Sequence, residues 1–537
     1  MSPGPSLPTT AELTPARELP TRVARSTPLK KGAANSASAV RAIWEDYLSI
    51  LVAHVSFAAL TIAGLALAAR LLGPESYGTV VLFTTVIQLL FIVGTKWSFP
   101  AMMRFGREAL VRQGRAGGVL WAWSPLLLGA VAACSLGLLV GSRTIAGLVG
   151  PQSPPLGVYL AVFALTCLGM ATVQLLQVQG RIKVAAWSPV IGKLTLVILL
   201  AWFSLRRDEP LTPVLVILAI AVGLAIQVLL SLGSVGKAVI LPLAFDWSLT
   251  RAMMRYSLPL WVGFLAAYLS EWVDLYFLRF VRGHADVGVY QIAYQAFLFL
   301  AGGIAGLYTL LFPLLTAWRA EGREDSVRRY AVRVIPQVSL LWGLVVLVLG
   351  LVHEPCFSAL FGPRFAQCSQ PFALLLIGLA FQPVIVLYST LFFTHDNPRQ
   401  NARMVVIMAT VNIFGDALLI PRWGMVGAAA ATAASFAVAA WLCLSWGNRQ
   451  LHLECRAALV PSLAAAAALS AMSGQGPIVR GLVLAGAALA LIGWARSSRI
   501  FSRDDLSMWE QVRCPRWMAA LIANIYTALS GRHTEGA

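Results

Sequence analysis

Charged side chains are scarce in this 537-residue chain, since Asp, Glu, Lys and Arg make up only 12% of it. A soluble domain usually carries about 25% charged residues, so the composition excludes an ordinary soluble protein. The alternating strand pattern of an outer-membrane barrel is also absent. Hydrophobic residues instead make up 58% of the chain, and they recur in runs of about 20, the length that spans a bilayer as an α-helix. The sequence therefore predicts an all-α polytopic membrane protein.

The chain also lacks the motifs of most enzymes. It has no G-x-x-x-x-G-K-[ST] phosphate loop, so ATP hydrolysis is not indicated. Its six His are scattered, and its seven Cys have no metal-binding spacing, so we expect no cofactor other than a coupling ion. Asp504-Asp505 has no glycosyltransferase-like partner motif and is predicted to be surface charge. Cys356 and Cys368 share one predicted loop, where they are either bonded or free.

Acidic residues are fewer than basic ones, 23 against 41, which gives a net charge of +18. Nucleic-acid binding is one explanation, but basic loops that orient membrane helices explain the excess better. We therefore expect no nucleic-acid partner. Residues 1–40 are rich in Pro, Ser, Thr and Ala and lack the apolar core of a signal peptide. They are predicted to form a disordered, basic cytoplasmic tail.

About fourteen apolar spans can be counted. They are 47–70, 77–101, 117–140, 156–180, 184–205, 211–236, 256–281, 287–316, 334–353, 368–394, 402–420, 424–447, 457–473 and 478–494. If the N-terminus is cytoplasmic and the spans alternate, 30 of the 41 Lys and Arg lie in cytoplasmic segments and nine in outer loops. This bias follows the positive-inside rule and predicts that both termini are cytoplasmic.

The sequence contains short stretches that are similar to one another. The segment GREALVRQ (106–113) is similar to GREDSVRR (322–329), and both basic phrases, as we call these two segments, fall in predicted cytoplasmic connectors six spans apart. The turns LLGPESYGTVV (71–81) and VRGHADVGVYQ (281–291) share a G-x-x-x-x-G spacing, and Phe99-Pro100 matches Phe312-Pro313. An even shift in span number predicts a parallel repeat.

The predicted organisation is therefore two parallel six-helix lobes around a central cavity, followed by two more helices. By residue number the parts are a tail at 1–40, an N-lobe at 41–240, a C-lobe at 241–450, spans 13 and 14 at 451–495, and a cytoplasmic tail at 496–537. In the last part, Trp517, Leu521 and Ile525 share a helical face near Arg513 and Arg516. That pattern predicts an interfacial amphipathic helix, with a fifteenth span as the alternative.

The sequence resembles the polysaccharide-flippase proteins, in the superfamily that includes multidrug extruders and the lipid II flippase. The resemblance covers roughly 45–450 and is carried by ARLLGPESYG, SLPLWVGFLAAYLSEWVDLYFLRFV, LFGPRFAQ and NIFGDALLIPRWGMVGAAAATAAS. It implies two lobes that open alternately to either side of the membrane. It also implies translocation of an undecaprenyl-pyrophosphate-linked oligosaccharide from the cytoplasmic to the outer leaflet.

Two lysines lie inside predicted spans, where ionisable groups are costly and often functional. Lys96 is near the cytoplasmic end of span 2, and Lys193 is in the cytoplasmic half of span 5. Both are candidates for binding a substrate pyrophosphate in the cavity. The alternative for Lys96 is that its side chain reaches out to the membrane interface.

Polar residues in the second half suggest a cation site. Glu271 and Asp274 share one helical face, as do Asn412 and Asp416. Their depth and that of Thr432 place hard oxygens at one level, which a hard cation prefers. The alternatives are an Asp274–Arg279 ion pair and hydrogen bonds between helices.

The resemblance to the lipid II flippase assigns a sodium site to five positions in this sequence. They are Asp274, Asn412, Asp416, Ala428 (carbonyl only) and Thr432, and Glu271 would be an additional carboxylate. Na⁺ or H⁺ would then act as the coupling ion.

We therefore expect a flippase for lipid-linked glycans in a bacterial inner membrane, not an enzyme. Its partners would be the lipid-linked oligosaccharide, membrane lipids, and the polymerase and glycosyltransferases of the same pathway. One alternative is a cation-coupled exporter of drugs or small solutes. A membrane-embedded polymerase or glycosyltransferase is less favoured, because the predicted outer loops are short.

Overall fold

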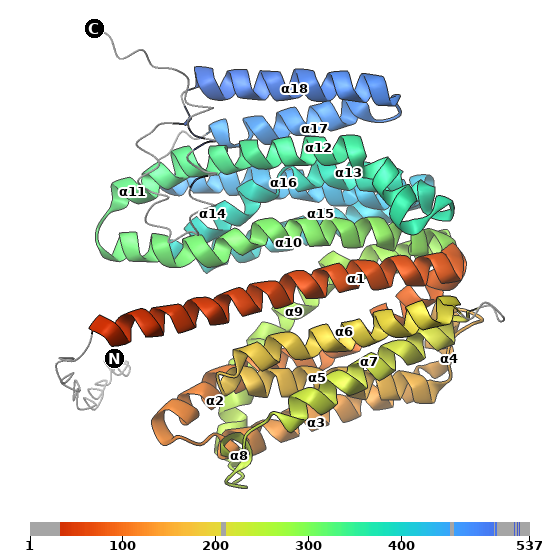
Figure 1. The fold of residues 1–537 in the computed structure, drawn as a ribbon, viewed down its shortest axis with the longest axis vertical. Coiled ribbons are helices and arrows are strands. Elements are labelled where there is room, and N and C mark those ends of the chain that lie inside the picture. The colour runs from red at the N-terminus through yellow and green to blue at the C-terminus, as the bar shows by residue number, and fades with distance from the viewer. Residues whose placement is uncertain are drawn as a thin grey trace, which may run out of the picture. The chain divides into compact units, whose positions relative to one another are not determined.

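The computed structural model describes residues 33–205, 211–451, 456–498, 500, 501, 520, 524 and 526. Two units are distinguished, Met1–Ser49 and Ile50–Ala537. The described residues of the first unit, 33–49, are helical. The second unit holds the candidate sites, and its described residues contain helices and no strand (Figure 1). The prediction of an all-α fold is confirmed.

The longer helices of the first half of the chain are α1 (Ala33–Leu89), α2 (Phe99–Gln113), α3 (Gly117–Val140), α4 (Ser142–Val149), α5 (Leu156–Val178), α6 (Ile182–Leu205) and α7 (Pro213–Gly233). The second half begins with the short α8 (Lys237–Ile240) and continues with α9 (Trp247–Val281), α10 (His284–Ala320), α11 (Glu324–Arg329), α12 (Ile335–Phe361), α13 (Ser369–Leu379), α14 (Gln382–Thr394), α15 (Pro398–Trp423), α16 (Met425–Leu451), α17 (Val460–Met472) and α18 (Pro477–Ser497).

Eleven helical segments of the described chain are long and apolar enough to cross a membrane. One of them, Ser49–Gln113, covers two predicted spans, which are separated by a kink at Gly73, where φ is 77°. The 35-residue α9 is not among the eleven and carries charged residues along its length. The 13-residue α17 is shorter than a usual span. The chain is thus a multi-pass membrane protein, and the count of fourteen spans stays a prediction.

Several boundaries differ from the predicted ones. Helix α1 begins at Ala33, so residues 33–40 are helical where a disordered tail is predicted, in keeping with the high helix propensity of Ala in AANSASAV. Helix α12 runs to Phe361, which places Cys356 on a helix and not in a loop. Cys356 is exposed, Cys368 is buried, and both are free.

The helices pack in two groups within the second unit (Figure 1). In the first group, α5 contacts α2, α3, α6 and α7. In the second group, α13 and α14 contact α10, α12 and α16, and α17 packs between α12 and α18. Helix α9 joins the groups, because it contacts α2 and α3 as well as α10 and α15.

The two basic phrases occupy different local structures. Gly106 is buried inside α2, whereas Gly322 has a φ of 73° in the turn after α10. The two stretches therefore differ in local structure, and their role as matching cytoplasmic connectors stays a prediction. The helix that follows span 2 continues through GREALVRQ, while α10 ends before GREDSVRR begins.

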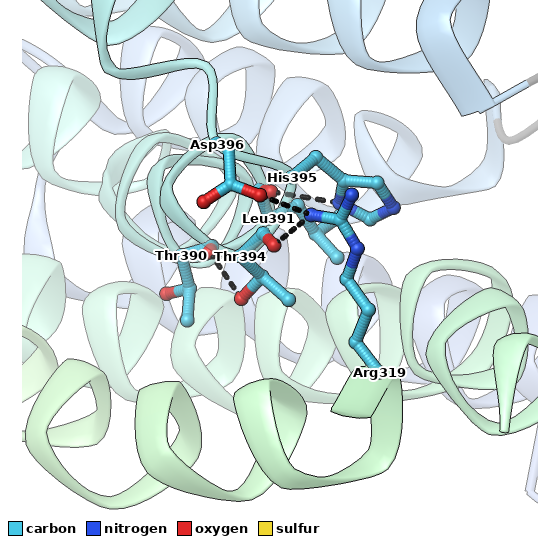
Figure 2. A network of polar contacts seen from close by, with 6 residues as sticks. All are labelled: Arg319, Thr390, Leu391, Thr394, His395 and Asp396. Atoms are coloured by element: carbon cyan, nitrogen blue, oxygen red, sulfur yellow. Dashed lines mark hydrogen bonds and ion pairs between the residues drawn. The ribbon is translucent and has the colours of Figure 1, made fainter. Parts of the chain in front are cut away.

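A different pair of arginines matches in the two halves. Arg107 Nη1 donates to Val178 O, the last residue of α5, at 2.9 Å. Arg319 Nη1 donates to Thr394 O, the last residue of α14, and lies 3.3 Å from Asp396 Oδ2 (Figure 2). Each arginine holds the carbonyl end of a neighbouring helix, where positive charge is stabilising.

The predicted C-terminal helical face, including Trp517, Leu521 and Ile525 with Arg513 and Arg516, lies outside the described residues, as does Asp504-Asp505. Tyr526 is described and is buried. Its hydroxyl bonds Gln337 Oε1 at 2.6 Å, and its ring packs on Phe501. This part of the tail therefore contacts the start of α12.

Candidate functional site

A cavity of about 560 Å³ lies mainly among helices of the first group and contains both candidate lysines in its wall. Helix α1 and the helices α5, α6 and α7 form most of this wall, and residues of α9 and α10 complete it. The cavity therefore adjoins both halves of the chain. Its lining is largely apolar, so the few polar groups in it determine what it can bind.

Lys96 is placed by an interruption of its helix. A π-helical turn, Leu90–Thr95, precedes it, and a 3₁₀ turn, Lys96–Ser98, leads into the Phe99-Pro100 start of α2. Such π-bulges are frequent at functional sites. The Lys96 ammonium lies 5.4 Å from the centre of the Phe264 ring, which attracts the cation.

Lys193 is placed by close packing of α6 on α7. A Cβ added to Gly192 would lie 2.7 Å from Gly223 O, and one on Gly223 would lie 2.5 Å from Gly192 O. Small residues allow membrane helices to approach this closely. The next residue, Lys193, then lines the cavity, with its ammonium 5.8 Å from the centre of the Phe57 ring.

Four glutamines, which the sequence analysis missed, line the same cavity: Gln88, Gln227, Gln291 and Gln295. Gln291 is buried, and its side-chain oxygen has no hydrogen-bond partner among the described residues. An amide offers both donors and an acceptor, so these side chains can bind hydroxyl-rich groups. The sequence feature that could have indicated these glutamines is their position within otherwise apolar spans.

An apolar pocket of about 410 Å³ borders this cavity. It lies among α1, α10 and α12, with Leu349, Val352 and Phe357 in its wall. Phe57, Thr61, Leu65 and Gln295 line both spaces. A polar head group and an apolar chain of one ligand could therefore occupy neighbouring sites.

The candidate cation residues lie on α9, α15 and α16, in the second half of the chain. Asp274, Asn412, Asp416 and Thr432 are all buried, with at most 5% of each exposed, and Ala428 is fully buried. Asn412 Nδ2 donates to Thr432 Oγ1 at 3.2 Å. The two carboxylates are close enough for their charges to interact. The structure thus brings these five residues of α9, α15 and α16 into one region.

Tight contact between α15 and α16 produces this arrangement. A Cβ on Gly415 would lie 2.8 Å from Ala431 Cβ, and one on Gly427 would lie 2.5 Å from Leu419 O. The Asn412–Asp416 face therefore packs against the face that carries Ala428 and Thr432. Helix α9 contacts α15 and brings Asp274 to the same region.

Asp416 is the least satisfied residue in this region. Neither carboxylate oxygen has a hydrogen-bond partner among the described residues. Asp274 Oδ1 accepts a bond from the Leu275 backbone at 2.8 Å. Buried carboxylates without partners are costly, and hard oxygens of this kind suit a small cation. The residues present therefore fit a bound Na⁺, and they also suit protonation.

Glu271 lies apart from this cluster. Its side chain is exposed, and it interacts electrostatically with Lys96. A spacing of three residues turns the helix by about 300°, which leaves Glu271 and Asp274 about 60° apart on one face. Asp274 is buried there, whereas Glu271 is exposed. Arg279 does not pair with Asp274 either, because its guanidinium bonds Leu148 O at 2.7 Å and Gly147 O at 3.1 Å. No group of three or more His, Cys, Asp or Glu in the described chain could hold a metal ion.

Comparison with known proteins places these features in context. A family model described as Lipid II flippase MurJ matches residues 154–489. The chain is 22% identical over 395 residues to the probable low-salt glycan biosynthesis flippase Agl15 of Haloferax volcanii, covering 73% of this chain and 80% of that protein. It is 28% identical over 184 residues to the probable flippase AglR of the same organism, covering 32% and 37%.

Two solved structures share the fold. The lipid II flippase MurJ in an inward closed conformation matches with a TM-score of 0.63 and 15% identity, covering 85% of this chain and 99% of the other. An inward-facing multidrug resistance MATE family transporter matches with a TM-score of 0.61 and 15% identity, covering 73% and 94%. Identities this low bear on the fold alone.

Proposed function

Because the chain belongs to the lipid II flippase MurJ family, we propose that it is a flippase that moves a lipid-linked glycan across the membrane. The carrier is undecaprenyl pyrophosphate or a similar lipid, and the glycan moves from the cytoplasmic to the outer leaflet of a bacterial inner membrane. Two curated relatives are named as flippases, one of them in glycan biosynthesis. In this proposal the protein is a transporter and performs no chemical step on its substrate.

The observation that carries the proposal is the cavity with Lys96 and Lys193, next to an apolar pocket. A lipid-linked glycan has an anionic pyrophosphate, a polar glycan and a long apolar tail. The lysines supply positive charge for the pyrophosphate, and the four glutamines supply donors and acceptors for sugar hydroxyls. The apolar pocket and the surrounding lipid accommodate the tail.

The buried carboxylates supply the coupling in this proposal. Asp274, Asn412, Asp416, Thr432 and the Ala428 carbonyl would hold Na⁺, or the carboxylates would hold a proton. Either ion neutralises negative charge that is otherwise buried without a partner, so its binding favours the arrangement in which these helices pack together. The ion then biases the alternation of the two halves between inward and outward openings.

Deleting the gene tests this function in cells. We expect loss of a surface polysaccharide together with accumulation of its lipid-linked precursor, because the polymerase and glycosyltransferases of the pathway would still be present. Restoring the wild-type gene should reverse both effects. Normal surface glycans combined with new sensitivity to cationic dyes would contradict the proposal and indicate an exporter.

A further inference from the structure

Two segments that begin helical spans meet reciprocally. Residues 73–78 of α1 and 283–288, at the start of α10, share the G-x-x-x-x-G spacing at an offset of 210 residues. A Cβ on Gly78 would lie 2.0 Å from His284 O, and a Cβ on Gly288 would lie 2.3 Å from Pro74 O. His284 and Pro74 are also related by this offset. Each segment therefore contacts the backbone of the other through an equivalent glycine.

Two arginines make a second pair of crossing contacts beside these glycines. Arg70 Nη2 donates to Ala359 O, in the last turn of α12. Arg279 donates to Leu148 O and Gly147 O, in the last turn of α4. A cation at the carbonyl end of a helix is stabilising, and charge-assisted hydrogen bonds are stronger than neutral ones. Each half of the chain thus holds a helix end of the other half.

We call the residues Arg70, Gly78, Arg279, His284 and Gly288, with the backbone they contact, the interlock. The interlock lies next to the cavity, because Tyr77 lines the cavity and also packs edge-on against Phe365, with ring centres 6.2 Å apart. The turns at Gly73 and Gly283, which are predicted outer loops, belong to the same end of the molecule. The cavity therefore ends where the two halves meet.

We propose that the interlock is the gate that closes the predicted outer end of the cavity, and that Arg70 and Arg279 are its paired latches. The inference rests on the proposed transport function, which requires that end to open in each cycle. Opening separates Gly78 and Gly288 from the backbone that each contacts, and it releases both arginines. These events occur together because the two sets of contacts are related by the internal sequence repeat. The gate therefore has two equivalent halves that act in parallel.

The test measures the separation of the two halves at this end, with the full chain in nanodiscs. The seven native cysteines are first replaced. Spin labels are then attached at Ala146→Cys, an exposed position in α4, and at Gln367→Cys, an exposed position after α12. Pulsed electron paramagnetic resonance then gives the distance distribution. We expect Arg70→Ala and Arg279→Ala each to raise the open-to-closed ratio about tenfold, the amount that charged hydrogen bonds of this kind contribute. The double variant should raise it further.

Matched controls separate a gate from general damage. Arg143→Ala removes an exposed arginine of α4, and Gly303→Ala adds a Cβ to α10 where nothing lies within 4 Å; both should leave the distances unchanged. Gly288→Ala should lengthen them, and Arg70→Lys should act more weakly than Arg70→Ala. Distances in the Arg70→Ala and Arg279→Ala variants that match those of Arg143→Ala would overturn the proposal.

Transport by the wild-type chain is measured separately in lipid vesicles that contain undecaprenyl-pyrophosphate oligosaccharide. Lengthened distances without glycolipid movement in the wild type would support the gate and refute the proposed substrate. Movement of the glycolipid by the wild type, without any change of distance in the variants, would support the proposed substrate and refute the gate.

Discussion

The interiors of the two halves carry opposite charge in opposite settings. In the first half, Lys96 and Lys193 are half-buried and line a cavity large enough for a ligand. In the second half, Asp274 and Asp416 are almost fully buried among packed helices. An accessible cation suits a large anionic substrate, whereas buried carboxylates suit only a small cation or a proton. In the proposed function, substrate binding therefore lies in the first half and ion coupling in the second.

Replacing both lysines should have the largest effect. Lys96→Gln together with Lys193→Gln would remove the two charged contacts that we propose for the substrate pyrophosphate. Each such contact contributes roughly a factor of ten, so we expect about a hundredfold slower flipping in vesicles. Lys237→Gln, which changes an exposed lysine of α8, should flip at the wild-type rate. Equal rates in all three proteins would show that the cavity charge does not bind substrate.

Asp416→Asn tests the other side of the comparison. Replacing K⁺ by Na⁺ at constant ionic strength should raise the melting temperature of the wild type. A ligand at a hundred times its Kd stabilises a protein by about 2.7 kcal/mol. The variant should show no such rise and no sodium-dependent transport, whereas Glu271→Gln should keep both. Full retention of both effects in Asp416→Asn would rule the site out.

Gly427→Ala should weaken the same site indirectly. Its Cβ would lie 2.5 Å from Leu419 O, so α15 and α16 must move apart. Overpacking of this kind costs about 1–3 kcal/mol, which thermal unfolding in detergent would detect. The sodium-dependent increase in melting temperature should also be smaller than in the wild type. Gly493→Ala, where nothing lies within 4 Å of the added Cβ, should change neither quantity.

Arg107→Ala and Arg319→Ala should have the smallest and most similar effects. Both arginines bond the last carbonyl of a neighbouring helix, at equivalent places in the two halves. Loss of either should lower the free energy of unfolding by roughly 1–2 kcal/mol without changing the sodium effect. A loss of transport in only one of the two variants would indicate that the halves are not equivalent there.

Much of the helical architecture could be predicted, because apolar length alone determines which segments cross a membrane. Helix α3 has the predicted bounds, 117–140. The ends of helices were less predictable, since Cys356 lies on a helical extension that no apolar run indicates. Asn412 and Thr432 lie in contact because a short turn joins two adjacent helices, and their role as cation ligands stays a prediction.

Features that depend on distant segments could not be predicted. Arg70 and Arg279 are examples, because each bonds a helix end that is far away in the sequence. The glutamines of the cavity come from three helices, α1, α7 and α10, and a Gln in an apolar run gives little signal. The direction of Glu271 depends on how α9 is rotated against its neighbours, which its spacing from Asp274 does not determine.

The proposed function requires the cavity lysines to bind the head group of a lipid-linked glycan during flipping. The most direct measurement is the rate at which labelled undecaprenyl-pyrophosphate oligosaccharide crosses vesicles that contain the purified chain. We expect rapid crossing with the wild type, and a rate close to that of protein-free vesicles with the Lys96→Gln, Lys193→Gln variant. Crossing at equal rates with both proteins, or no crossing with the wild type, would contradict it.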